Sequence, residues 1–228
     1  MNYLISKVPF LRRFYFEQSE LNRTLLLSCL FSIVLVCIRG VYADNWRYIS
    51  LIWNLFLAFV PYWISNAVSK RDVWKQSNIK FFAFLTCWLL FLPNSFYIIT
   101  DLFHLRQNVS IPLWFDLALI FSFAWNGLLM GVISVRQIEK VIEKKWDIET
   151  GIWFLYPIML LNALGIYLGR YLRFNSWDVV TNPSNLIDEI RYLLVHPIRN
   201  RFDWGMIFCY AVLMTLIYVT VKRISKAI

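Results

Sequence analysis

The sequence predicts an all-α protein, a polytopic transmembrane helical bundle of about six spans with a short amphipathic helix on its outer surface. Of the 228 residues, 59% are hydrophobic and the mean hydropathy is +0.55, far above that of a soluble domain. The apolar residues also gather in segments of about 20, the length that a helix needs to cross a bilayer. No polar stretch is long enough to bury a separate aqueous core, so we expect residues 1–228 to form a single integral membrane domain.

Six segments are apolar enough to cross the membrane as helices, which pair every backbone polar group internally. The predicted spans are Thr24–Val41, Ile49–Val68, Phe81–Ile99, Leu113–Val135, Ile152–Leu168 and Trp204–Val221. The first apolar run leads into Arg39 without a small-residue cleavage site. We therefore interpret it as a retained span and not as a signal peptide.

The basic residues predict the orientation of the spans. Fifteen of the 23 Lys and Arg residues lie on the side that holds both chain ends, and five of the other eight lie in the long fifth connection. Because Lys and Arg concentrate in cytoplasmic loops, both termini are predicted to be cytoplasmic. The chain has a net charge of +9, but its basic residues flank apolar runs and form no continuous basic face. We therefore expect no nucleic-acid partner.

The sequence indicates no cofactor. All four cysteines fall in apolar runs and lack the spacing of a metal or redox motif. A divalent ion held by Asp101 and His104 with Asp116 or Asp178 is one alternative. However, the chain has only two histidines and no metal-ligand motif, so we predict no metal site.

One long connection, from about Gly169 to Asp203, falls on the predicted outer side. It contains a helical start signal, Asn182-Pro183-Ser184, and a stop signal at Pro197. The apolar residues between them repeat at helical spacing: Leu186, Ile187, Ile190, Leu193 and Leu194. We expect an amphipathic helix over about Ser184–His196, lying on the outer ends of the third and fifth spans and covering the polar residues there.

Polar residues gather at the predicted outer end of the third span, where they are costly and often mark function. If the helix continues through Pro93, the spacing places Asn94, Tyr97, Asp101 and His104 on one face. The alternative is a proline kink with a polar cap, in which Asn94 satisfies backbone groups that the proline frees.

A second polar group follows the fifth span, where Arg170 and Arg173 precede Asn175, Trp177 and Asp178. The two arginines could hold an anion, or they could anchor the span at the headgroups. We expect an ion pair between Asp101 and one of these arginines, because unpaired charges at that depth are expensive.

Small and polar residues within the spans have a structural interpretation as well. Glycines at helical spacing most often let two helices approach closely, as expected for Gly165, Gly169, Gly127 and Gly131. Single polar residues inside a span most often form a hydrogen bond between helices. This interpretation applies to Arg39, Asn54, Asp116 and Asn126.

The chain resembles a group of bacterial integral membrane proteins catalogued as a domain of unknown function, number thirteen sixty-one. The resemblance covers most of the chain and is carried by two motifs: Leu92-Pro93-Asn94 with Tyr97, Thr100 and Asp101, and Gly169-Arg170 with Arg173, Asn175, Ser176, Trp177 and Asp178. It implies a multi-pass protein of a bacterial cell membrane and brings no established activity with it.

The polar residues at the outer side predict a site for an anionic amphiphile, such as a phospholipid or a lipid-linked phosphate, because guanidinium groups bind phosphate and carboxylate. The proposed ligand-binding residues are Asn94, Tyr97, Asp101, His104, Asp116, Arg170, Arg173, Asn175, Trp177 and Asp178. Expected partners are membrane lipid and a further membrane protein. Two alternatives stay open, an accessory or scaffold subunit of a membrane complex and a membrane-embedded hydrolase or transferase. The hydrolase would use Asp101 with His104 and a hydroxyl such as Ser95 or Ser176, so whether the protein is an enzyme is left undecided.

Overall fold

The described residues of the protein form an all-helical structure, which confirms the predicted fold class. The computed structural model describes residues 9–70, 77–105, 111–174 and 177–227. No strand occurs within these ranges. The helices in chain order are α2 (Pro9–Ala43), α3 (Ser50–Lys70), α5 (Asn78–Tyr97), the 3-10 helix η1 (Ile98–His104), α6 (Leu113–Trp146), α7 (Ile152–Arg170), α8 (Asp178–Thr181), α9 (Pro183–Val195) and α10 (Arg201–Ala227).

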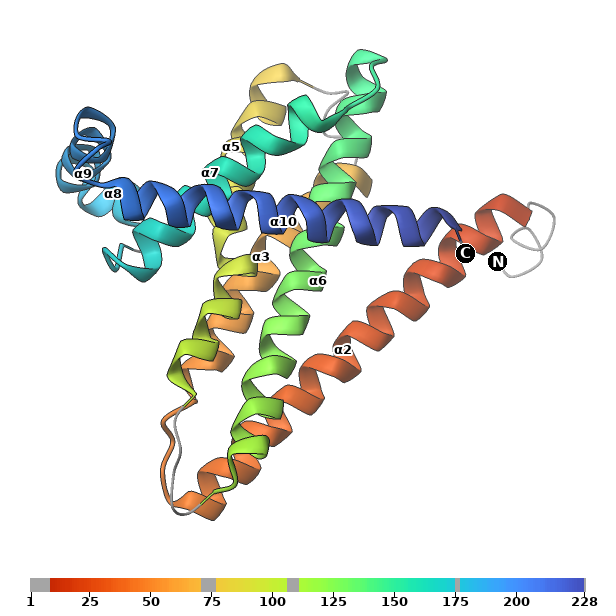
Figure 1. The fold of residues 1–228 in the computed structure, drawn as a ribbon. Coiled ribbons are helices and arrows are strands. Elements are labelled where there is room, and N and C mark those ends of the chain that lie inside the picture. The colour runs from red at the N-terminus through yellow and green to blue at the C-terminus, as the bar shows by residue number, and fades with distance from the viewer. Residues whose placement is uncertain (1–8, 71–76, 106–110, 175–176, 228) are drawn as a thin grey trace.

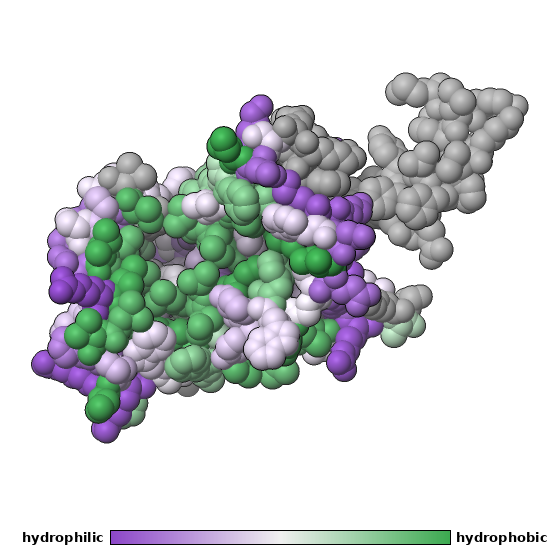
Figure 2. All heavy atoms as spheres, turned by 90° about the horizontal axis from the view of Figure 1, so that it is seen from above, coloured by the Kyte–Doolittle hydropathy of each residue, from purple (hydrophilic) through white to green (hydrophobic). Residues whose placement is uncertain are grey.

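Six of these helices are long and apolar enough to span a membrane, so the chain is a multi-pass membrane protein. The spans are Glu20–Ala43, Ser50–Lys70, Asn78–Phe103, Leu113–Trp146, Ile152–Arg170 and Arg201–Ser225. Many large apolar side chains on them are exposed, and Figure 2 shows apolar residues over much of the face that it presents. Such a surface is unfavourable in water and suits the hydrocarbon of a bilayer.

Helix α6 is the centre of the bundle. Of its apolar window, 61% is buried, against 28 to 44% for the other spans. It packs against α2, α3, α5 and α10, while α7 packs against α5 and α10. In Figure 1, α3, α5 and α6 run alongside one another, and α10 crosses in front of them.

Three of the four glycines predicted to allow close helical approach do so, and they bring two helices close to the end of α5, whereas a Cβ added to Gly169 would meet its nearest neighbour only at 3.5 Å. A Cβ atom added to Gly165 of α7 would overlap Cγ of Pro93, and one added to Gly127 of α6 would lie 2.6 Å from the carbonyl oxygen of Ser95. At Gly131 the added atom would meet the Phe96 ring at 2.7 Å. Only hydrogen fits at these three positions, so α5 is held close to α6 on one side and to α7 on the other.

Parts of several helices meet at two separate places in the bundle. Residues from the start of α2, the end of α3, the second half of α6 and the end of α10 line one common pocket, which places the described chain ends on the same face. The end of α2, the start of α3 and the start of α6 meet at the other place, where Arg39 contacts Asp116.

Some predicted boundaries were wrong. The segment after Val135 was expected to be a loop, but α6 continues to Trp146, because a helix does not end where it leaves the apolar region. The third span continues as an α-helix through Pro93 only to Tyr97, and then tightens into η1. The amphipathic helix was predicted correctly, since α9 begins at Pro183 and ends two residues before Pro197.

Candidate functional site

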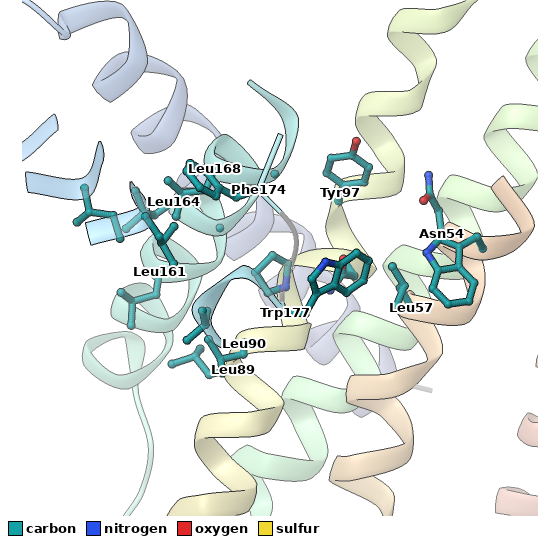
Figure 3. A pocket seen from close by; sticks show the side chains of 18 residues that line it. Asn54, Leu57, Leu89, Leu90, Tyr97, Leu161, Leu164, Leu168, Phe174 and Trp177 are labelled. Carbon is teal, nitrogen blue, oxygen red and sulfur yellow. The ribbon is translucent and has the colours of Figure 1, made fainter. Parts of the chain in front are cut away.

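A pocket of about 330 Å³ lies at the predicted outer ends of α3, α5 and α7, and we call it the outer pocket. Leucine is the commonest residue of its walls, and six leucines come from these three helices: Leu57, Leu89, Leu90, Leu161, Leu164 and Leu168. The polar lining consists of Asn54, Asn94 and Tyr97. Figure 3 shows the leucines of α7 on one side, Asn54 and Leu57 of α3 on the other, and Tyr97 and Trp177 between them. The outer pocket is therefore apolar with a few polar groups, as ligand sites usually are.

The proline of α5 and its neighbour form part of the pocket wall. Pro93 cannot donate a hydrogen bond to the preceding turn, so that turn has an unused backbone carbonyl. The amide of Asn94 donates to the carbonyl oxygen of Phe91 at 3.1 Å. The carbonyl that Pro93 frees is that of Leu89, so this contact does not confirm the predicted cap, and Asn94 also lines the outer pocket.

An ion pair between Arg170 and Asp101 stands beside the outer pocket, which confirms the predicted contact. Arg170 Nη1 lies 3.3 Å from Asp101 Oδ1, and the two side chains are only 13% and 5% exposed. The guanidinium also donates to the carbonyl oxygen of Thr100 at 2.9 Å and to the Tyr97 hydroxyl at 3.3 Å. Asn54 donates to the other carboxylate oxygen at 3.1 Å. The pair therefore joins α3, α7 and η1 and fixes Tyr97, which forms part of the pocket wall.

The two arginines of the fifth span have different environments, so they do not form a pair of ligand-facing guanidiniums. Arg173 follows α7 with a left-handed backbone, φ 61°, and its side chain is exposed. It forms no ion pair within the described part of the chain. The next residue, Phe174, lines the outer pocket, and its backbone N–H donates to the carbonyl of Leu168. Arg173 thus directly precedes a pocket residue in the chain, but it does not itself line the outer pocket.

The chain then returns past the pocket through two short helices. Trp177 and Val179 line the outer pocket, and Asp178 accepts a hydrogen bond from the Thr181 hydroxyl at 3.1 Å. Helix α9 reaches the pocket with Leu186 and Ile190. The helix thus borders the outer pocket, while its action as a cover stays a prediction.

Asp116 belongs to a separate polar cluster. It pairs with Arg39 of α2 through Nε at 2.8 Å, both side chains being at most 3% exposed. The Tyr48 hydroxyl donates to the same carboxylate at 3.4 Å, and its ring lies 4.4 Å from the guanidinium carbon. Burial raises the pKa of the Tyr48 phenol, and the Asp116 carboxylate adds to that shift. Asp116 holds helices together here and does not line the outer pocket.

The predicted site residues therefore divide into groups. Asn94, Tyr97 and Trp177 line the outer pocket, and Asp101 and Arg170 lie beside Tyr97. The side chain of His104 and all of Asn175 lie outside the described residues. The contribution of α3 to the pocket was missed, although Asn54 was noted as a polar residue within a span.

Two residues of the hydrolase alternative make contacts within the fold, while the His104 side chain and Ser176 lie outside the described residues. The Asp101 carboxylate already accepts from Arg170 and Asn54, which weakens it as a general base. Ser95 is fully buried and donates to the carbonyl of Ala58, so its hydroxyl cannot reach a ligand. Within the described ranges, no group of three metal-ligating side chains comes together.

A family model described as "Protein of unknown function (DUF1361)" matches residues 53–217. The matched segment contains every residue that lines the outer pocket. No curated protein and no solved structure matches the chain.

Proposed function

Because the chain belongs to the DUF1361 family, whose description gives no function, we propose a function from the outer pocket: this multi-pass membrane protein binds an anionic amphiphile there. A phospholipid or a lipid-linked phosphate has the required chemistry. The apolar chain of the ligand would occupy the leucine-lined part of the pocket, and its head would lie at the polar end.

The leucine-rich lining is the observation that carries this proposal. Leucines from three helices surround a space of about 330 Å³ that also reaches the apolar residues of α9. A soluble polar ligand would leave these walls without partners, whereas an acyl or isoprenoid chain would contact them favourably. The pocket size supports binding of the first part of such a chain with its head.

The polar end of the pocket supports an anionic head. Asn54 and Asn94 line the pocket with their amide groups, and Arg173, which directly precedes the lining residue Phe174, is exposed and forms no ion pair with a described carboxylate. Arg170 contributes indirectly, because it holds Tyr97 in the wall while Asp101 balances its charge. A guanidinium forms strong, charge-assisted hydrogen bonds with phosphate oxygens.

The orientation is part of the proposal. In the alternating topology predicted from the sequence, 15 of the 23 Lys and Arg residues fall on the side of both termini, so we place that side in the cytoplasm and the outer pocket at the opposite surface. We place the protein in the plasma membrane of a bacterial cell, where such amphiphiles are abundant. Helix α9 then lies at the outer membrane surface, where it borders the entrance to the pocket.

Native mass spectrometry after extraction in mild detergent tests this function. The variant Leu164→Trp fills the pocket with a larger ring, and Leu216→Trp, at an exposed lipid-facing position of α10, is the matched control. We expect wild type and the control to retain an anionic lipid that Leu164→Trp loses. Equal retention by all three proteins, or a stoichiometric protein in place of lipid, would contradict the proposal. The second result would favour an accessory subunit.

A further inference from the structure

A second pocket lies at the face of the bundle that holds both described chain ends, and we call it the inner pocket. It has a volume of about 270 Å³ and is formed by α2, α3, α6 and α10. None of its lining residues belongs to the outer pocket. Its polar lining is Asn22, Tyr62, Asn66, Arg136, Gln137, Lys140, Lys222 and Ser225.

A buried carboxylate organises one wall of the inner pocket. Glu139 is only 2% exposed, and it accepts hydrogen bonds from Arg136, from the Tyr218 hydroxyl and from Lys222 Nζ, the last at 2.7 Å. These contacts tie α10 to α6. The side chains of Arg136 and Lys222 remain 29% and 23% exposed, so both cations keep part of their surface toward the pocket.

This wall carries more positive than negative charges. Lys140 lines the pocket one helical turn after Arg136, is exposed, and forms no ion pair with a described residue. The wall thus has three cations, Arg136, Lys140 and Lys222, and one carboxylate, Glu139, which leaves an excess of two positive charges. Across from them, the half-buried amide of Asn66 makes no hydrogen bond to another described residue. The wall offers both charge and unused hydrogen-bond donors to an anion.

Apolar side chains complete the lining of the inner pocket. Leu21, Val132, Ile133 and Val221 line the same space, so it is not simply an open basic surface. An anion at this depth would be partly shielded from water and salt, which strengthens its contacts with the cations. The apolar residues would accept the beginning of a chain attached to the anion.

We propose that the inner pocket is a second binding site and that it takes a phosphate group. Arg136, Lys140 and Lys222 bind the phosphate oxygens, and the Asn66 amide donates a further hydrogen bond. The phosphate belongs either to the head of an anionic lipid of the same leaflet or to a free anion from the adjoining aqueous phase. Glu139 positions two of the cations and does not contact the ligand.

The test uses the Leu164→Trp background, in which the outer pocket is filled, so that any bound anion reports on the inner pocket alone. Phosphatidylglycerol is titrated onto delipidated protein and counted by native mass spectrometry, with phosphatidylcholine as the zwitterionic comparison. Lys140→Gln removes the unpaired cation of the pocket. Lys144→Gln, four residues further along α6 and outside the pocket, removes the same charge from the same basic end and serves as the control.

We expect Lys140→Gln to weaken phosphatidylglycerol binding about tenfold, as the loss of one charge-assisted hydrogen bond implies, and Lys144→Gln to leave it within about twofold. Asn66→Leu changes no charge and is expected to weaken binding as well, which separates a pocket from general surface attraction. Displacement of the lipid by inorganic phosphate would assign the site to a free anion, and resistance to phosphate would assign it to a lipid head. Equal effects of the two lysine variants, or equal binding of phosphatidylcholine, would overturn the proposal.

Discussion

The ion pair between Arg39 and Asp116 is predicted to be one of the strongest single links in the fold. The two side chains meet through two hydrogen bonds, at 2.8 and 3.4 Å, and both are almost fully buried. Removing one member leaves the other charge without its partner, which costs about 3 to 5 kcal/mol at buried sites. We therefore expect Arg39→Met and Asp116→Leu each to lower the free energy of unfolding by about that amount.

Sodium dodecyl sulfate titration in mixed micelles, followed by tryptophan fluorescence, measures this loss. The double variant Arg39→Met/Asp116→Leu removes both charges, so it is expected to recover most of the stability and to lie within about 1.5 kcal/mol of wild type. Asp188→Asn, at an exposed position of α9, is the control and is expected to change stability by less than about 0.5 kcal/mol. The reasoning is refuted if the double variant loses the sum of the two single losses, or if a single variant is as mild as the control.

Three further predictions follow from other parts of the structure. Gly165→Leu is expected to lower the yield of folded protein, because even a Cβ atom would overlap the proline of α5. Gly205→Ala should be tolerated, because a Cβ atom there meets no atom within 4 Å. Size-exclusion chromatography in detergent compares the two yields. Because the pKa of Tyr48 is raised in the folded state, its contribution to stability is fully present below pH 10 and is lost as the pH rises through the folded-state pKa. In unfolding titrations above about pH 10, wild type should therefore lose more stability than Tyr48→Phe. On a background without native cysteines, Asn200→Cys should react with an impermeant reagent added outside the cell and Lys144→Cys should not, and the opposite labelling pattern would reverse the proposed orientation.

The sequence allowed the spans and one ion pair to be predicted because the membrane restricts what a chain can do. A segment of about 20 apolar residues has few alternatives to a spanning helix, so all six spans were found. Asp101 and Arg170 both end their spans at the same surface, where an unpaired charge is costly, and their contact followed from that cost. Glycine spacing predicted close helical packing but not that Gly165 faces Pro93.

Other features depend on tertiary contacts that periodicity does not contain. Asp44, Asp101 and Asp116 all lie near the outer end of a span, so the sequence could not show which of them pairs with Arg39. Glu139 was missed because hydropathy detects only the apolar part of α6 and the helix extends beyond it. A spacing signal was present nevertheless, since Arg136 lies one turn before Glu139 on α6.

Photocrosslinking tests the central claim most directly, which is that an anionic amphiphile occupies the outer pocket. Purified protein in nanodiscs is irradiated with a phosphatidylglycerol that carries a photoreactive group on its acyl chain, and the labelled peptides are identified by mass spectrometry. The account predicts label on residues 89–97 and 161–174, and loss of this label in Leu164→Trp. Label spread evenly over the exposed faces of the six spans, unchanged in that variant, would contradict it.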